Sequence, residues 1–210
     1  MNVQFGCGLS APKNWRNFDS SPTLRIQKMP FIGKTLAHKI QGFNFPSNVE
    51  YGDIVNGLPV AKDSCDNLYC SHVLEHLSYE DFKAALANSY SYLKPGGTFR
   101  LIMPDLNSLI SSYNSNYQNQ NKEAATKFNR DSGMAVERPK ARGIINMIKS
   151  YYGNSNHLWL WDYPSAILAV ENAGFTSIRK CEFNDSPILD FKDVEDESRF
   201  NNAVCLEVSK

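Results

Sequence analysis

Strand signals and helix signals alternate along most of this 210-residue chain, and that alternation is what most narrows its fold. Short β-rich runs predict seven strands, at 3–5, 16–19, 49–55, 65–71, 98–103, 178–183 and 203–208. Apolar positions at helical spacing predict helices over 79–93 and 164–173, and the second half of 24–40 is also expected to be helical. Such alternation is typical of a parallel sheet with helices on its faces. We therefore predict an α/β, Rossmann-like, doubly wound sheet of about seven mostly parallel strands.

Length and composition fit one compact unit. A chain of this size buries roughly 70–75% of its unfolded surface, so we expect a single domain over 1–210. The segment 105–157 is rich in Asn, Ser, Tyr and Gln and is too long for a plain loop. We predict that it is a helical insertion after the fifth strand that covers the substrate. The segment 185–197 carries six acidic residues, and we expect it to be a solvated loop.

The charge balance limits the kinds of partner that this chain can bind. Lys plus Arg and Asp plus Glu both number 22, so the chain has no strong field of one sign, and we predict no nucleic-acid partner. No apolar run approaches the roughly 18 residues of a membrane helix, and the start lacks a secretory pattern, so we expect no membrane contact and a cytoplasmic location. Five cysteines without paired CxxC spacing indicate neither a disulfide framework nor a thiolate zinc site, and we assign no metal ligand.

A Gly-x-Gly pair follows the first predicted strand. In Phe5-Gly6-Cys7-Gly8 the missing side chains let the backbone turn sharply and come close to a ligand. Glycine pairs also serve in simple turns, so both interpretations stay open for this motif alone.

Two carboxylates end the next predicted strands. Asp19 closes the second strand and Asp53 the third, so in a parallel sheet both face the same crevice as the glycine turn. There they can accept hydrogen bonds from ribose hydroxyls or from an adenine amine. The alternative is that each aspartate caps a helix or turn.

Five motifs in a fixed order carry a family resemblance. FGCG, WRNFD, GDIVNGLPV, CDNLYCSHVLEHLSYEDF and YLKPGGTFRLIMPD follow one another between Val3 and Asp105, and a looser similarity extends over 161–183. In this order they resemble the class I S-adenosylmethionine-dependent methyltransferases, particularly small predicted ones with an HVLEHL segment. The resemblance implies S-adenosylmethionine as the methyl donor and a methyl acceptor, which we expect to be a small molecule.

The resemblance also implies a donor site. Its expected residues are Phe5, Gly6, Cys7, Gly8, Asp19, Asp53, Ile54, Ser71 and His72. The glycines would approach the amino-acid portion, Asp19 would hold the ribose, and Asp53 with Ile54 would flank the adenine. Ser71 and His72 would lie beside the methionine portion and the sulfonium.

The chain departs from the family pattern near its start. About ten residues separate Gly8 from Asp19, which are too few for a full crossover helix, so we expect the first helix to be short or absent. The sequence also begins directly at its first strand. The cover over the donor must then come from elsewhere, and 105–157 is the expected source.

Histidines are the expected catalytic groups. An oxygen or nitrogen acceptor often has to lose a proton, and histidine titrates in the right range to accept it. We predict His157 as the general base, with His72 as the second candidate. His157 lies beside Trp159, Trp161 and Tyr163, an aromatic cluster that either contacts the acceptor or packs in the core. A basic group at 138–149 is interpreted as a solvated face.

Three alternatives remain from the sequence. The segment from His72 to His76 fits the H-x-x-E-H pattern of inverted zinc peptidases, which requires both histidines on one helix. The glycine turn and an acidic strand end also fit a nicotinamide-dependent oxidoreductase, although the third glycine of that fingerprint is missing. The third is a binding module that has kept the fold but lost turnover.

Overall fold

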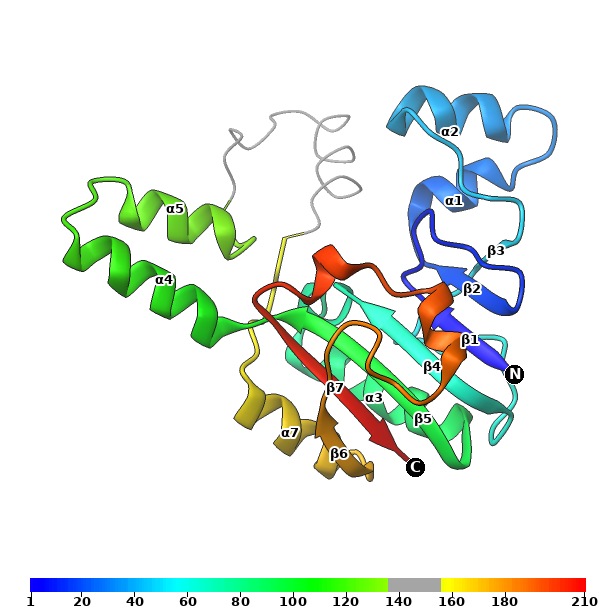
Figure 1. The fold of residues 1–210 in the computed structure, drawn as a ribbon. Coiled ribbons are helices and arrows are strands. Elements are labelled where there is room, and N and C mark those ends of the chain that lie inside the picture. Colours follow the sequence, from blue (N-terminus) through cyan, green and yellow to red (C-terminus); the bar gives the residue numbers. More distant parts are fainter. Residues whose placement is uncertain (136–155) are drawn as a thin grey trace.

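The computed structural model describes residues 1–135 and 156–210. In this part of the chain seven strands form one sheet, in the order β3-β2-β1-β4-β5-β7-β6 (Figure 1). The strands are β1 (Asn2–Phe5), β2 (Trp15–Asp19), β3 (Val49–Tyr51), β4 (Cys65–Ser71), β5 (Leu93–Pro104), β6 (Thr176–Lys180) and β7 (Ala203–Ser209). Neighbours among β1 to β5 pair in parallel, whereas β7 is antiparallel to both β5 and β6. The predicted doubly wound, mostly parallel sheet is confirmed.

Helices follow most of the strands. They are α1 (Pro22–Gln27), α2 (Gly33–Gln41), α3 (Tyr79–Tyr92), α4 (Leu106–Gln118), α5 (Ala124–Asp131) and α7 (Tyr163–Asn172), with the 3₁₀ helices η1 (Leu74–His76), η2 (Leu189–Asp193) and η3 (Glu197–Phe200). Helix α3 begins where the Ser78 side chain accepts a hydrogen bond from the Asp81 backbone, and α7 begins with a capping box at Asp162. None of the described helices has the length and hydrophobicity needed to cross a bilayer.

Some predicted boundaries differ. The expectation that only the second half of 24–40 is helical was wrong, because Pro22 lies in the first turn of α1, where its fixed φ favours a helix. Strand β3 ends at Tyr51 instead of 55, since the Gly52 N–H bonds to the Asp19 carbonyl and the chain then turns. Strand β5 begins earlier, at Leu93, which pairs with Cys65 across a register shift.

No helix lies between β1 and β2. Residues 6–14 form turns, as expected from their short length, and β1 still pairs with β2 in parallel. Consequently, this connection cannot cover a face of the sheet.

Helices α3 and α7 pack on one face, where a large apolar core includes Leu68, Phe82 and Val170.

The connection from β6 to β7 covers the opposite face. It crosses in front of β4 and β5 in Figure 1, where its Phe191 and Val194 pack with Trp15, Tyr69 and Ile102. Strand residues alternate between the two cores, as Tyr69 lies on this side and its neighbour Cys70 on the other. The expectation that 185–197 is a solvated loop was therefore wrong.

A buried arginine holds this connection against the sheet. Arg100 of β5 is fully buried, and its guanidinium lies 2.9 Å from Glu195, 3.0 Å from Asp185 and 2.9 Å from Glu207. It also stacks over the Phe191 ring, 5.4 Å from the centroid. Two of the six acidic residues are thus counter-charges of a buried cation, which a count of charges along the sequence does not reveal.

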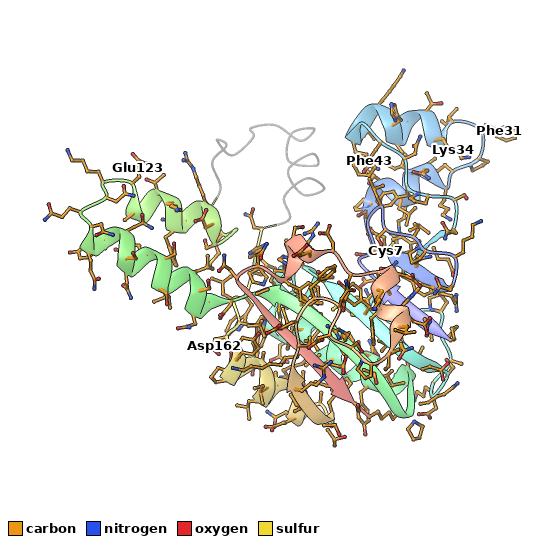
Figure 2. The ribbon with its side chains drawn as sticks, viewed as in Figure 1. Cys7, Phe31, Lys34, Phe43, Glu123 and Asp162 are labelled. Carbon is orange, nitrogen blue, oxygen red and sulfur yellow. The ribbon has the colours of Figure 1, made fainter. Side chains whose placement is uncertain are left out.

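Two helical pairs rise at the carboxyl ends of the strands. Pair α1–α2 follows β2 and pair α4–α5 follows β5, with Phe31 and Glu123 marking their outer turns in Figure 2. The predicted insertion after the fifth strand thus contains two helices within its described part. The basic group at 138–149 and the rest of that insertion up to 155 lie outside the described residues.

The cover on the second face leads to a stability prediction. Replacing the buried Phe191 by alanine should lower the free energy of unfolding by about 3–5 kcal/mol, because it removes a ring packed on the sheet. Leu189→Ala, two residues away at a side chain that is 71% exposed, should change it by less than about 0.5 kcal/mol. Denaturant titration measures both. Equal effects would mean that this connection does not cover the sheet.

Candidate functional site

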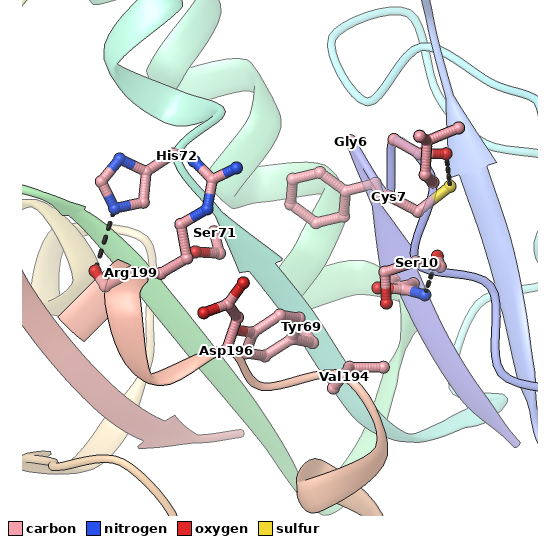
Figure 3. Close-up of a pocket in the computed structure, with 13 residues that line it drawn as sticks. Gly6, Cys7, Ser10, Tyr69, Ser71, His72, Val194, Asp196 and Arg199 are labelled. Atoms are coloured by element: carbon pink, nitrogen blue, oxygen red, sulfur yellow. Dashed lines mark hydrogen bonds between the residues drawn. The ribbon is translucent and has the colours of Figure 1, made fainter. Parts of the chain in front are cut away.

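A cavity of about 340 Å³ opens at the carboxyl ends of β1 and β4 (Figure 3). Three segments far apart in the sequence form its wall: the glycine turn, the end of β4, and the end of the β6–β7 connection. The residues lining it are Gln4, Phe5, Gly6, Cys7, Gly8, Leu9, Ser10, Tyr69, Ser71, His72, Val194, Asp196 and Arg199. Its size falls in the range of small-molecule sites. It includes six of the nine residues expected around the donor.

The two glycines of the turn lie in different surroundings. Both have left-handed backbone angles, with φ of 64° at Gly6 and 54° at Gly8. A Cβ at Gly6 would lie 2.2 Å from a methyl group of Val73, so that glycine is required by packing within the protein. A Cβ at Gly8 would meet nothing within 4 Å. Open space therefore adjoins the backbone at Gly8, on the wall of the cavity.

Asp19 holds the glycine turn in place through hydrogen bonds from outside the cavity. Its carboxylate accepts the Gly8 N–H at 2.9 Å and the Ser21 N–H at 2.8 Å, one on each oxygen. Asp19 is not part of the cavity wall. A carboxylate has about four acceptor positions, so two remain after these bonds.

Asp53 and Ile54 lie beyond the cavity wall, at the same edge of the sheet. The adjacent Gly52 bonds to the Asp19 carbonyl, which keeps the two aspartates at neighbouring strand ends. The Asp53 oxygens accept hydrogen bonds from the Val55 N–H at 2.9 Å and from the Asn56 amide at 2.6 Å. Ile54 is buried in the larger core. Placing these residues around a bound adenine remains a prediction.

Three of the seven cavity residues that sequence reasoning missed carry polar groups at the end of β4 and in the β6–β7 connection. Tyr69, Asp196 and Arg199 line the cavity, and Figure 3 shows them facing Ser71 and His72. The hydroxyls of Tyr69 and Ser71 are buried, and neither has a hydrogen-bond partner outside this pair among the described residues. Asp196 was missed because it belongs to the segment 185–197, which was taken for a solvated loop, and Arg199 follows that segment directly.

A second cavity of about 360 Å³ adjoins the first. Its wall consists of His72, Pro104, Ser108, Leu109, Ser112, Asp131, His157, Asn201 and Asn202. Both histidines expected to be catalytic therefore face one cavity, although 85 positions separate them in the sequence. His72 lines the two cavities and marks where they meet.

His72 is held in an unusual backbone conformation. Its φ is 54°, a left-handed angle that costs a side-chain-bearing residue about 1–3 kcal/mol when the surroundings enforce it. The surroundings here are specific, since its N–H donates to the Ile102 carbonyl at 2.8 Å and its ring Nε2 contacts the Arg199 carbonyl at 2.9 Å. The angle also separates His72 from η1, so the single helix required by the zinc-peptidase pattern is absent.

Three histidines surround the carboxylate of Glu75. Its Oε1 lies 3.5 Å from Nδ1 of His72, 3.9 Å from Nε2 of His76 and 3.8 Å from Nε2 of His157. Glu75 is only 1% exposed, and among the described residues no other residue donates a hydrogen bond to either oxygen. We call these four residues the Glu75 cluster.

The far nitrogen of each ring contacts a backbone carbonyl. These contacts are His72 with Arg199 at 2.9 Å, His76 with Asn156 at 3.2 Å and His157 with Ser132 at 2.8 Å. Carbonyl oxygens only accept, so each far nitrogen carries the proton of its ring.

Burial shifts the titration of this cluster. Removal from solvent lowers the pKa of His72 and of His157, which favours neutral rings. It also raises the pKa of Glu75 to about 7. A neutral ring that donates from its far nitrogen presents a lone pair on its near nitrogen, and in each case that nitrogen faces Glu75.

The aromatic cluster after His157 divides into two parts. Trp161 is buried and stacks on Phe82 with 4.1 Å between ring centroids, so it belongs to the core. Trp159 is exposed and packs beside Tyr79. Neither tryptophan lines the two cavities described above.

Comparison with known proteins agrees with the observed fold. A methyltransferase-domain family model matches residues 27–101. An Archaeoglobus fulgidus S-adenosylmethionine-dependent methyltransferase superimposes with a TM-score of 0.52 at 15% identity, covering 100% of this chain and 85% of that one. One from Thermotoga maritima gives 0.51 at 16% identity, with 100% and 81% covered. The sequence has no match among curated proteins.

The family match includes the end of β4 and the HVLEHL segment, and the sheet has the strand order found in these methyltransferases. These findings also set aside the peptidase and oxidoreductase alternatives. Residues 27–101 thus match the methyltransferase-domain family, and the whole chain has the fold of the class I S-adenosylmethionine-dependent methyltransferases.

Proposed function

We propose that this methyltransferase transfers the methyl group in line to an oxygen or nitrogen atom of a small polar molecule bound in the second cavity. The observation that carries this proposal is the shared wall at His72, which puts the acceptor cavity directly beside the cavity at the glycine turn. We further propose that 1–210 acts as one domain, with α4 supplying Ser108, Leu109 and Ser112 to the acceptor side.

The first cavity fits the donor. Open space at Gly8 lets a ligand lie against the backbone, and the buried hydroxyls of Tyr69 and Ser71 have unused hydrogen-bonding capacity. Its wall also holds one cation, Arg199, suited to the carboxylate of the methionine portion. In this assignment the remaining acceptor positions of Asp19 accept hydrogen bonds from the ribose. Asp53 and Ile54 lie farther along the same edge of the sheet, next to the adenine.

Alignment is the main task of the protein groups. When bound, S-adenosylmethionine supplies an activated methyl group, and the electron pair of the broken C–S bond stays on sulfur. Holding two reactants in line can lower the barrier by roughly 7–11 kcal/mol. His72, fixed at both its backbone and its ring, separates the two cavities at a defined position.

The Glu75 cluster is the proposed activating group. An acceptor hydroxyl or amine must lose a proton, and the second cavity brings His72 and His157 to its wall. Their neutral rings, and the raised pKa of Glu75, suit proton transfer near neutral pH. This supports the predicted importance of both histidines, with the carboxylate between them as a further member of the group.

The assignment of the first cavity predicts unequal effects for two glycine variants. Gly8→Ala adds a methyl group to the open space and should weaken S-adenosylmethionine binding by roughly 5- to 150-fold, the equivalent of about 1–3 kcal/mol of overpacking. Gly96→Ala is the matched control, since Gly96 also has a positive φ and open space around it but lies in the irregular first part of β5, outside both cavity walls. Isothermal titration calorimetry measures the affinity of both variants for S-adenosylmethionine. Equal affinities would place the donor elsewhere.

The second cavity predicts a difference between neighbouring residues of α4. Leu109→Trp fills the cavity and should lower kcat/KM at least about tenfold for an acceptor found by screening with labelled methyl donor, while donor affinity is unchanged. Ile110→Trp places the same side chain at an exposed position outside the cavity wall and should alter neither quantity. If both variants keep full turnover, the acceptor does not bind in this cavity.

A further inference from the structure

The Glu75 cluster has an unbalanced hydrogen-bonding pattern. In a neutral ring the nitrogen that contacts a backbone carbonyl is the donor, which leaves His72 Nδ1, His76 Nε2 and His157 Nε2 as acceptors. All three nitrogens face Oε1 of Glu75, which is also an acceptor. Nearly complete burial of that carboxylate without a donor from another residue is costly.

One proton cannot correct this pattern. A proton on Glu75 would satisfy a single nitrogen and leave the other two facing an oxygen without a donor. A cation at the centre would interact favourably with the carboxylate and all three lone pairs together. The near atoms of Glu75, His76 and His157 lie within 4.8 Å of one another, close enough for one ion to contact all of them.

We propose that Glu75, His76 and His157 bind a divalent transition-metal ion at the junction of the two cavities, with the fourth coordination position open. Two histidines and one glutamate form the protein ligands of several catalytic zinc sites, and imidazole nitrogen suits zinc, cobalt and iron. Metal–nitrogen distances of about 2.0–2.1 Å place tetrahedral ligand atoms about 3.3 Å apart. The ligand nitrogens of His76 and His157 lie 3.9 Å and 3.8 Å from Oε1, and all three ligand atoms lie within 4.8 Å of one another, so they draw together when the ion binds.

The surroundings of the ligands match those of metal sites. Metal-binding histidines almost always donate their other ring N–H to a carbonyl or carboxylate, which fixes the ring and its tautomer. All three rings of the cluster have such a carbonyl partner.

Backbone contacts also hold the cluster together. The Glu75 carbonyl accepts the Leu158 N–H at 2.8 Å, and the His157 N–H donates to the Gly133 carbonyl at 3.0 Å. A Cβ at Gly133 would lie 2.4 Å from the His157 ring, so only a glycine at position 133 leaves room for that ring. These contacts hold two of the ligands, Glu75 and His157, in place before an ion binds.

The proposed ion has a role in methyl transfer if the proposed function is correct. One of its ligands, His157, lines the acceptor cavity beside His72, so an acceptor hydroxyl there can reach the open position of the ion. Binding to a divalent metal lowers the pKa of a water molecule or hydroxyl, and the released proton passes to solvent. The oxygen lone pair is then available for the new C–O bond. This consequence rests on the proposed function, whereas the binding of the ion does not.

Cobalt uptake tests the site directly. The full chain is dialysed against a chelator and titrated with CoCl₂ alone, and visible absorption is recorded. We expect one ion per chain and the absorption bands of cobalt with nitrogen and oxygen ligands, abolished by excess ZnCl₂. His76→Asn, His157→Asn and Glu75→Gln should each weaken uptake by more than the roughly 10- to 100-fold typical of losing a supporting contact. His38→Asn, at an exposed position of α2, should bind cobalt as the wild type does.

Donor binding to the same samples separates the two proposals. His76 lines neither cavity, so His76→Asn should lose cobalt and keep its affinity for S-adenosylmethionine, which also shows that it folds. A wild-type protein that binds the donor and takes up no cobalt overturns the metal site alone. Undiminished uptake by the three cluster variants overturns it as well. Cobalt uptake without donor binding supports the metal site and contradicts the proposed function.

Discussion

The rest of this structure depends on one constraint. No helix between β1 and β2 covers the apolar face of the sheet that carries Tyr69 and Ile102. Only turns connect β1 to β2, so that face would be open to water without another cover. The β6–β7 connection supplies it through Phe191 and Val194, and the buried Arg100 neutralises two of its carboxylates. Since this connection ends in η3 at the carboxyl edge of the sheet, the same constraint brings Asp196 and Arg199 to the donor cavity.

The cover and the site are therefore coupled. The carbonyl of Arg199 contacts the ring of His72, so a segment that completes the fold also orients the residue shared by both cavities. The left-handed angle of His72 persists because a backbone bond to Ile102 and this ring contact both favour it. A loss of packing under Phe191 would then act on the site as well as on stability.

The sequence was sufficient to predict the sheet, because strands such as β4 and β7 have β-rich apolar runs that local patterns reveal. It also singled out the glycine turn and the two histidines, His72 and His157, as individual residues. It could not predict that His72 and His157 converge on Glu75, since that depends on contacts between segments about 80 residues apart. Nor can a run of acidic residues show whether water or a buried arginine balances it, which is why the β6–β7 connection was misjudged.

Stability alone does not account for the Glu75 cluster. Replacing a buried charged group and its partners by apolar side chains of similar volume is often neutral or stabilising, so a purely structural position has no need of them. Here separate segments, η1 and the chain around 132 and 157, each supply backbone groups that hold the cluster. Methyl transfer depends on alignment more than on any single proton transfer. In the proposed function, a rigid polar centre where the two cavities meet contributes to that alignment, because the groups that it presents to both cavities are held by backbone contacts and cannot rotate away.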